Sequence, residues 1–166
     1  LPDELFALTN LISLDISRNG FIGTLSSMIE RLTTLKTLRG AYNDLSGEIP
    51  SSIGNLGMLQ EISLEENNFF GALPSSLENL LFLKSISLQA KTRTSAGLSG
   101  PPLSFAKSPQ LRNIDLGSNS LTGTIPDDLL LAAASSPGER ITVQFDSNFL
   151  TGFVPTSLAL RFIQLD

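Results

Sequence analysis

The feature that most constrains the fold of this chain is an apolar pattern repeated at a fixed phase. Asn19, Asn43 and Asn67 lie 24 residues apart, and each follows apolar residues five and eight positions earlier. The pattern returns around Asn119 and, in part, around Asn148, after one irregular copy. A period of this length predicts a solenoid, in which each repeat stacks on its neighbours.

Each part of the repeat has a structural role. Alternating apolar and polar residues before the asparagine predict a short strand whose apolar side chains point inward. Strands of successive repeats then form a parallel sheet, and the asparagine amide can bond the backbone of neighbouring turns. Later glycine and proline residues turn the chain outward, where segments such as 50–56 favour short helical turns. Because no repeat buries its apolar edge alone, stacking supplies the core.

The element L-x-G-x-I-P, present at 45–50 and 121–126, resembles the plant-type leucine-rich repeat family, as in receptor-like kinase ectodomains and polygalacturonase-inhibiting proteins. The resemblance implies an α/β solenoid, a right-handed superhelix with a parallel β-sheet on its concave face and short helical or 3-10 turns on its convex face. It implies a further strand near 47–49 and 123–125, and an extracellular or cell-surface location. The matching positions are framework positions, so they specify the fold and not a ligand.

The domain organisation follows from the repeat. We expect residues 1–166 to form one leucine-rich repeat domain that is a fragment of a longer array, because Leu1-Pro2 has the same phase as Ile49-Pro50. Further repeats or a co-receptor are expected at the open ends, since solenoid ends expose apolar edges. The six predicted copies lie near residues 8–31, 32–55, 56–79, 80–107, 108–136 and 137–160.

Composition argues against several classes of function. Eleven basic and sixteen acidic residues give a net charge of −5, whereas nucleic-acid binders carry a basic patch. Cysteine and histidine are both absent, which removes zinc clusters, thiol nucleophiles and the commonest general base. No apolar run reaches the roughly 18 residues needed to span a membrane. We expect no enzymatic activity, no cofactor, no metal and no nucleic-acid partner.

The outward positions of the predicted sheet form the conventional binding surface of a solenoid. They are mostly polar and acidic, with six carboxylates against two cations. The charged members are Asp15, Arg18, Arg39, Glu61, Glu65, Glu66, Asp115 and Asp146, and the small Ala41, Ala90 and Gly117 are also assigned outward.

The densest carboxylate group on this surface consists of Glu61, Glu65 and Glu66, beside Arg39 and Tyr42 of the preceding repeat. One interpretation is an electrostatic patch for a basic peptide or protein, with the tyrosine as an aromatic anchor. The alternative is a solvated polar face that keeps the sheet soluble. The sequence leaves both interpretations open.

Two insertions interrupt the pattern. In the fourth copy Lys91 replaces the asparagine, and about five additional residues, including Arg93, precede Gly97. This loop is either a tolerated surface insertion or a ligand-contacting loop that adds Lys91 and Arg93 to the site. A second insertion, at 130–134, is expected to lengthen a helix on the outer side.

The leading functional hypothesis is a non-enzymatic recognition domain that binds a protein, peptide or glycan through the concave sheet. One alternative is a structural or adhesive repeat array without a discrete ligand. Another is an inhibitor of a cell-wall-degrading enzyme, a role that some members of the resembled family have.

Overall fold

The computed structural model describes residues 1–91, 97–130 and 140–155. Arg93, the inserted residues around it, and residues 131–134 of the helix extension predicted at 130–134 lie outside the described residues. The first residue of this extension, Leu130, is described and lies in a turn with a φ of +61°, so the predicted helix does not include it. Within the described part, no helix is long and apolar enough to cross a membrane.

The repeats stack so that their first strands form one parallel sheet along the concave face. Its strands pair in consistent register, and the central residue of each strand is buried while its flanking residues are more exposed. One strand lies in each of the six predicted copies, so the predicted parallel sheet is confirmed. In order, the strands are β1 (Ser13–Asp15), β3 (Thr37–Arg39), β5 (Glu61–Ser63), β8 (Ser85–Ser87), β10 (Asn113–Asp115) and β12 (Thr142–Gln144).

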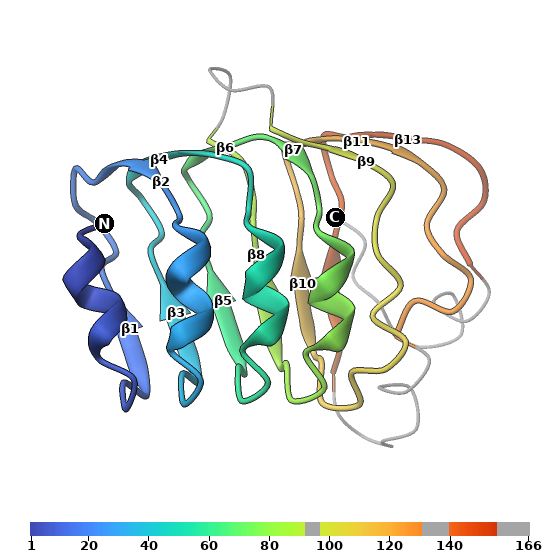
Figure 1. The fold of residues 1–166 in the computed structure, drawn as a ribbon. Coiled ribbons are helices and arrows are strands. Elements are labelled where there is room, and N and C mark those ends of the chain that lie inside the picture. The colour runs from blue at the N-terminus through green and yellow to red at the C-terminus, as the bar shows by residue number, and fades with distance from the viewer. Residues whose placement is uncertain (92–96, 131–139, 156–166) are drawn as a thin grey trace.

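Further short strands follow each asparagine position and line a second edge of the solenoid, at the top of Figure 1. They form a three-stranded sheet, β2-β4-β6, and a four-stranded sheet, β13-β11-β9-β7. Their bounds are β2 (Ile22–Thr24), β4 (Asp44–Gly47), β6 (Asn68–Phe69), β7 (Gly71–Ala72), β9 (Leu98–Gly100), β11 (Ser120–Gly123) and β13 (Phe149–Leu150).

The prediction that this additional strand lies near 47–49 and 123–125 was wrong in position. Strands β4 and β11 end at Gly47 and Gly123. Both glycines have a positive φ, +87° and +82°, in the left-handed region that side chains disfavour. The glycine therefore turns the chain out of the strand instead of beginning it.

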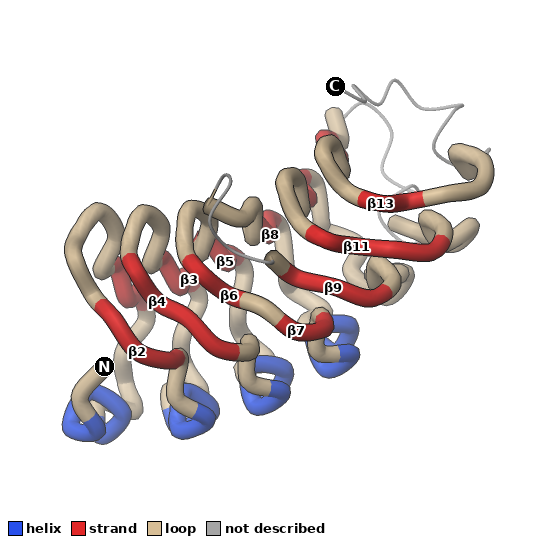
Figure 2. The backbone as a smooth tube through the Cα atoms, turned by 90° about the horizontal axis from the view of Figure 1, so that it is seen from above, coloured by secondary structure: helices blue, strands red, loops and turns tan. Residues whose placement is uncertain are grey.

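Short 3-10 helices cover the convex side of the first repeats, as predicted for segment 50–56. Figure 2 shows them along one side of the stack, with the strands of each repeat set behind them. A proline or serine in extended conformation precedes each helix. The helices are η1 (Asp3–Ala7), η2 (Ser27–Arg31), η3 (Ser51–Asn55) and η4 (Ser75–Asn79).

Buried asparagines join consecutive repeats, which confirms their predicted structural role. Asn67 accepts a hydrogen bond from the Leu45 N–H at 3.0 Å and donates to the Gly40 carbonyl at 2.8 Å, both in the preceding repeat. It also donates to Leu64 of its own repeat at 3.0 Å. One amide thus satisfies backbone groups that a buried bend would otherwise leave unpaired. Asn43, Asn119 and Asn148 repeat this arrangement.

Candidate functional site

The concave sheet presents the outward side chains of consecutive strands side by side. Three positions assigned outward by the repeat pattern, Ala41, Ala90 and Gly117, are instead buried. At these positions the chain leaves the strand and bonds to a neighbouring repeat: the Ala41 carbonyl accepts from Arg18 N–H at 2.8 Å, and Ala90 N–H donates to Gly117 at 3.3 Å. These buried residues therefore add no exposed side chain to the concave face.

Arg39 and Glu61, both predicted site residues, form an ion pair with each other. The Arg39 Nε lies 2.7 Å from Glu61 Oε1, and its Nη2 lies 2.8 Å from Oε2. This two-pronged contact raises the pKa of Arg39, and Asp15 on the neighbouring strand contributes further in the same direction. The two charges offset each other, so Glu61 does not add a free negative charge to the surface.

Tyr42 is linked to the predicted glutamates through its backbone, because its N–H donates to the Glu65 carbonyl at 2.9 Å. Its ring forms a stack with Arg18 of the preceding repeat. The Arg18 guanidinium carbon is 4.4 Å from the centroid of the tyrosine ring, within the range of a cation–π interaction. Both residues have a φ of +57° and occupy the position just before the asparagine in adjacent repeats. Arg18 was not among the predicted site residues, although the shared phase indicates this proximity.

Glu65 and Glu66 are adjacent in sequence, but their backbone conformations differ. Glu66 has a positive φ of +57°, and its N–H donates to the Gln89 carbonyl at 2.9 Å. The Glu65 carboxylate accepts a hydrogen bond from the Ser63 hydroxyl at 2.8 Å. Glu65 is also close enough to Asp115, two strands further along the sheet, to raise the pKa of that carboxyl.

Asp115 is a carboxyl group on the concave face whose pKa is raised. Burial raises its pKa, and repulsion from Asp146 and Glu65 raises it further, while a 3.1 Å hydrogen bond from the Gly117 N–H opposes the shift. Gly117 leaves room for this arrangement, because a Cβ there would lie 2.7 Å from Asp146 Oδ1. We name Glu65, Asp115 and Asp146 the acidic cluster.

The acidic cluster has no cationic partner within the described residues, whose two salt bridges are Arg39–Glu61 and Lys91–Asp44. Sequence reasoning placed Asp115 and Asp146 on this face but did not select them as site residues. The repeat pattern does not show which cation pairs with which carboxylate. In the structure Arg39 pairs with Glu61 and not with a member of the acidic cluster. In the same part of the chain, no group of three His, Cys, Asp or Glu side chains is arranged to hold a metal ion.

Lys91, predicted as a ligand contact, is directed away from the acidic cluster. Its Nζ lies 2.8 Å from Asp44 Oδ1, in β4 on the second edge of the solenoid. Asp44 also accepts from the Asn68 amide at 3.5 Å, and the hydrogen bond with Lys91 is the main cause of its lowered pKa. The structure therefore does not join Lys91 to Glu65, and Arg93 lies in the undescribed segment.

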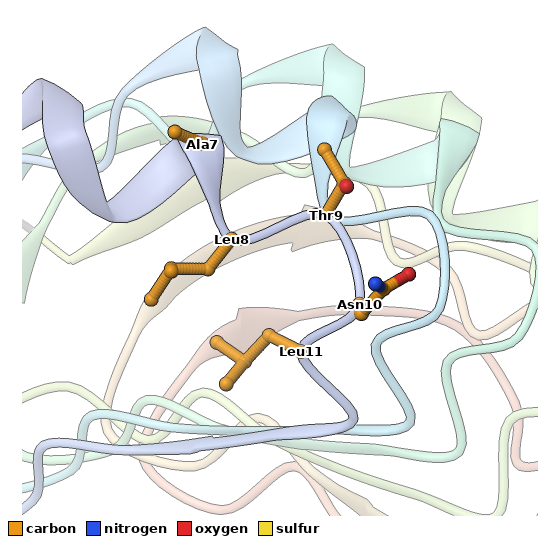
Figure 3. A pocket seen from close by; sticks show the side chains of 5 residues that line it. All are labelled: Ala7, Leu8, Thr9, Asn10 and Leu11. Carbon is orange, nitrogen blue, oxygen red and sulfur yellow. The ribbon is translucent and has the colours of Figure 1, made fainter.

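A shallow hollow lies at the N-terminal end of the array (Figure 3). It is lined by five consecutive residues, Ala7 to Leu11, and contains no titratable side chain. None of the predicted site residues lines it. The hollow is therefore separate from the concave surface.

Comparison with known proteins agrees with this architecture. The sequence profile described as Leucine Rich Repeat matches residues 10–32, 58–80 and 110–130. No curated protein matches the chain significantly. Among solved structures, a plant peptide hormone receptor, RGFR1 in complex with RGF2, matches with a TM-score of 0.87 and 27% identity, over 100% of this chain and 26% of that chain.

Two Arabidopsis structures add to this comparison. The ectodomain of the receptor kinase HAESA, in complex with an N-terminally extended IDA peptide hormone, has a TM-score of 0.80 and 30% identity over 95% of this chain and 25% of that one. A chain of the BIR3–SERK2 complex of Arabidopsis thaliana has a TM-score of 0.66 and 30% identity over 87% of this chain and 71% of that one.

The present chain spans about a quarter of the length of the two hormone receptors, but more than two thirds of the matched chain in the BIR3–SERK2 complex. The repeat pattern, the parallel concave sheet and the asparagine hydrogen bonds extend over most of the described chain. This chain belongs to the plant-type leucine-rich repeat family.

Proposed function

We propose that this chain is a non-enzymatic recognition domain of a cell-surface protein, and that its concave face binds a peptide or protein through a basic group. The observation that carries this proposal is the acidic cluster, whose carboxylates lack a cationic partner within the described residues. One similar structure is the ectodomain of a receptor kinase in complex with a peptide hormone, and another is a peptide hormone receptor in complex with RGF2, which supports both the location and the class of ligand.

The electrostatics of the acidic cluster favour a cationic ligand. Asp115 is partly desolvated and lies near two other carboxylates, so its ionised form is disfavoured in the free protein. A guanidinium or ammonium group placed among Glu65, Asp115 and Asp146 would relieve that repulsion and donate several charge-assisted hydrogen bonds to the carboxylates. Glu61 is already paired with Arg39, so the basic group is expected nearer to β10 and β12 than to β3.

The proposal is tested by removing the negative charges without changing side-chain size. The variant combines Glu65→Gln, Asp115→Asn and Asp146→Asn, and the probe is a fluorescein-labelled peptide of alternating glycine and arginine. Loss of the charge-assisted contacts should weaken binding by about tenfold or more in fluorescence anisotropy, and added salt should weaken wild-type binding.

A matched control removes three carboxylates from exposed positions away from the concave sheet, with Asp3→Asn, Glu4→Gln and Asp128→Asn. It changes the net charge by the same amount and should bind nearly as the wild type does. Equal losses in both variants would show a general charge effect. Unchanged binding in the acidic-cluster variant would refute the assignment.

A further inference from the structure

The turns that lead from the convex side into β3, β5, β8 and β10 differ in charge from the rest of the molecule. They comprise residues 31–36, 55–60, 79–84 and 106–112, and form the row of turns at the bottom of Figure 1. We name them the basic edge, because they contain no aspartate or glutamate. All sixteen acidic residues, and the other six basic ones, lie elsewhere in the chain. The basic residues of this edge are Arg31, Lys36, Lys84, Lys107 and Arg112.

Backbone hydrogen bonds place three of these basic residues, Lys36, Lys84 and Arg112, in one row. Gln60 N–H donates to the Lys36 carbonyl, Lys84 N–H donates to the Gln60 carbonyl, and Arg112 N–H donates to the Lys84 carbonyl, each at 2.8 Å. Adjacent strands are about 4.8 Å apart, so Lys36 and Lys84 are separated by about 10 Å along the row. Neither lysine belongs to a salt bridge within the described residues.

Apolar side chains are exposed among these cations. Met58, Leu81 and Phe82 have 44%, 49% and 47% of their surface accessible to solvent. Met58 and Phe82 occupy equivalent positions in neighbouring repeats, two residues before Gln60 and Lys84, so they lie side by side. Several large apolar side chains gathered on one surface, with charged residues around them, are typical of a contact site.

The surroundings of the basic edge limit what binds there. The concave face on one side bears the acidic cluster, and the convex face on the other bears Glu30 and Glu78 in η2 and η4. A broad anionic surface, such as a lipid bilayer, would also approach these carboxylates and be repelled. A narrow ligand that follows the row would avoid them. Burying the exposed Met58, Leu81 and Phe82 side chains against apolar groups of a ligand would stabilise the complex, which favours a protein segment over a polysaccharide.

We propose that the basic edge binds an acidic, extended segment of a partner protein that carries apolar side chains. Carboxylates of the segment pair with Lys36 and Lys84, and its apolar side chains cover Met58, Leu81 and Phe82. Charge complementarity favours an acidic partner, because this edge is positive on a protein whose net charge is −5. The site is distinct from the acidic cluster, which would attract a ligand of the opposite charge.

The test uses a fluorescein-labelled peptide of alternating glutamate and leucine, with binding followed by fluorescence anisotropy. The variant Lys36→Gln with Lys84→Gln, and separately Met58→Ser with Phe82→Ser, should each weaken binding by about fivefold or more. A charge-matched control, Ala72→Glu with Thr122→Glu at exposed positions on the opposite edge, should stay within about twofold of the wild type. Unchanged circular dichroism and melting temperature verify that each variant is folded.

The other outcomes are also decisive. Unchanged binding in both edge variants, or an equal loss in the control, would overturn the proposal. Tighter association with phosphatidylserine-containing vesicles than with the peptide would assign the edge to lipid instead. Self-association in sedimentation velocity that the lysine substitutions abolish would assign it to a second copy. The acidic-cluster variant should bind the acidic peptide at least as well as the wild type, which separates this proposal from that of the concave site.

Discussion

The Nζ of Lys91 lies 2.8 Å from Oδ1 of Asp44, although 47 residues separate them in the chain. Lys91 occupies the phase at which other repeats have the asparagine that joins them to the preceding turn. The Lys91 side chain reaches β4 of the second repeat from the fourth, while its own N–H donates to the Asn67 carbonyl at 3.2 Å. This exposed ion pair therefore joins the irregular fourth repeat, which lacks the linking asparagine, to the second repeat.

The first prediction concerns this ion pair. In Lys91→Gln the pKa of Asp44 should rise toward its ordinary value of 3.8, because its hydrogen bond with the ammonium is the main cause of the lowering. In the wild type, the ion pair stabilises the folded state fully at pH values above the unfolded-state pKa of Asp44. This stabilisation is lost as the pH falls through the lower folded-state pKa of Asp44. Carboxyl-carbon NMR titration measures the shift. Lys107→Gln serves as the control, and an unchanged Asp44 titration in Lys91→Gln would contradict the assignment.

The second prediction separates a buried asparagine from an exposed one. Asn67→Ala should lower the free energy of unfolding by about 2–4 kcal/mol, because it leaves buried backbone groups of Leu45 and Gly40 without partners. Asn19→Ala should cost less than about 1 kcal/mol, since Asn19 is exposed and its amide bonds only to its own repeat. Urea unfolding measures both values. Equal losses would show that the inter-repeat bonds do not determine stability.

The third prediction concerns the close approach of η3 and η4. A Cβ added at Gly54 would lie 2.4 Å from the Ser76 carbonyl oxygen, so Gly54→Ala should destabilise the protein by about 1–3 kcal/mol. Gly57 lies three residues later and has no such neighbour within 4 Å. Gly57→Ala should therefore change the stability by less than about 1 kcal/mol. Thermal and urea unfolding of the two variants provide the comparison, and a stable Gly54→Ala protein would mean that the two turns can separate.

The fourth prediction concerns Asp115, whose pKa is raised by burial and then by the nearby Asp146 and Glu65. A raised folded-state pKa means that ionised Asp115 weakens the folded state at neutral pH. Asp115→Asn should therefore be more stable than the wild type at pH 7, because asparagine retains an oxygen that accepts from Gly117 N–H without carrying the charge.

This advantage of Asp115→Asn should shrink as the pH falls through the raised folded-state pKa toward the ordinary value of 3.8, since the wild-type carboxyl becomes protonated. Urea unfolding at several pH values measures the difference, and the exposed Asp128→Asn is the control. A pH-independent difference between wild type and Asp115→Asn would rule out an electrostatic origin.

The repeat phase alone predicted the concave strands, the inward apolar residues and the linking asparagines. These features depend on the alternation of apolar and polar residues within each strand and on the regular spacing of the repeats. Both can be read directly from the sequence. The phase also placed Arg39 and Glu61 on neighbouring strands, where they lie diagonally across the pair, because the register joins Arg39 to Ser63 and Thr37 to Glu61. The predicted position of the additional strand near 47–49 was less accurate, since the left-handed conformation of Gly47 determines where that strand ends.

The tertiary structure decided which charges remain free. Arg39 lies between Asp15 and Glu61, and side-chain geometry determines that it pairs with Glu61. The irregular fourth repeat directs Lys91 to Asp44 and away from the acidic cluster. The desolvation of Asp115 depends on neighbours from several strands. Periodicity therefore determines the backbone framework, whereas charge pairing and burial arise from contacts between repeats, where single residues depart from the shared pattern.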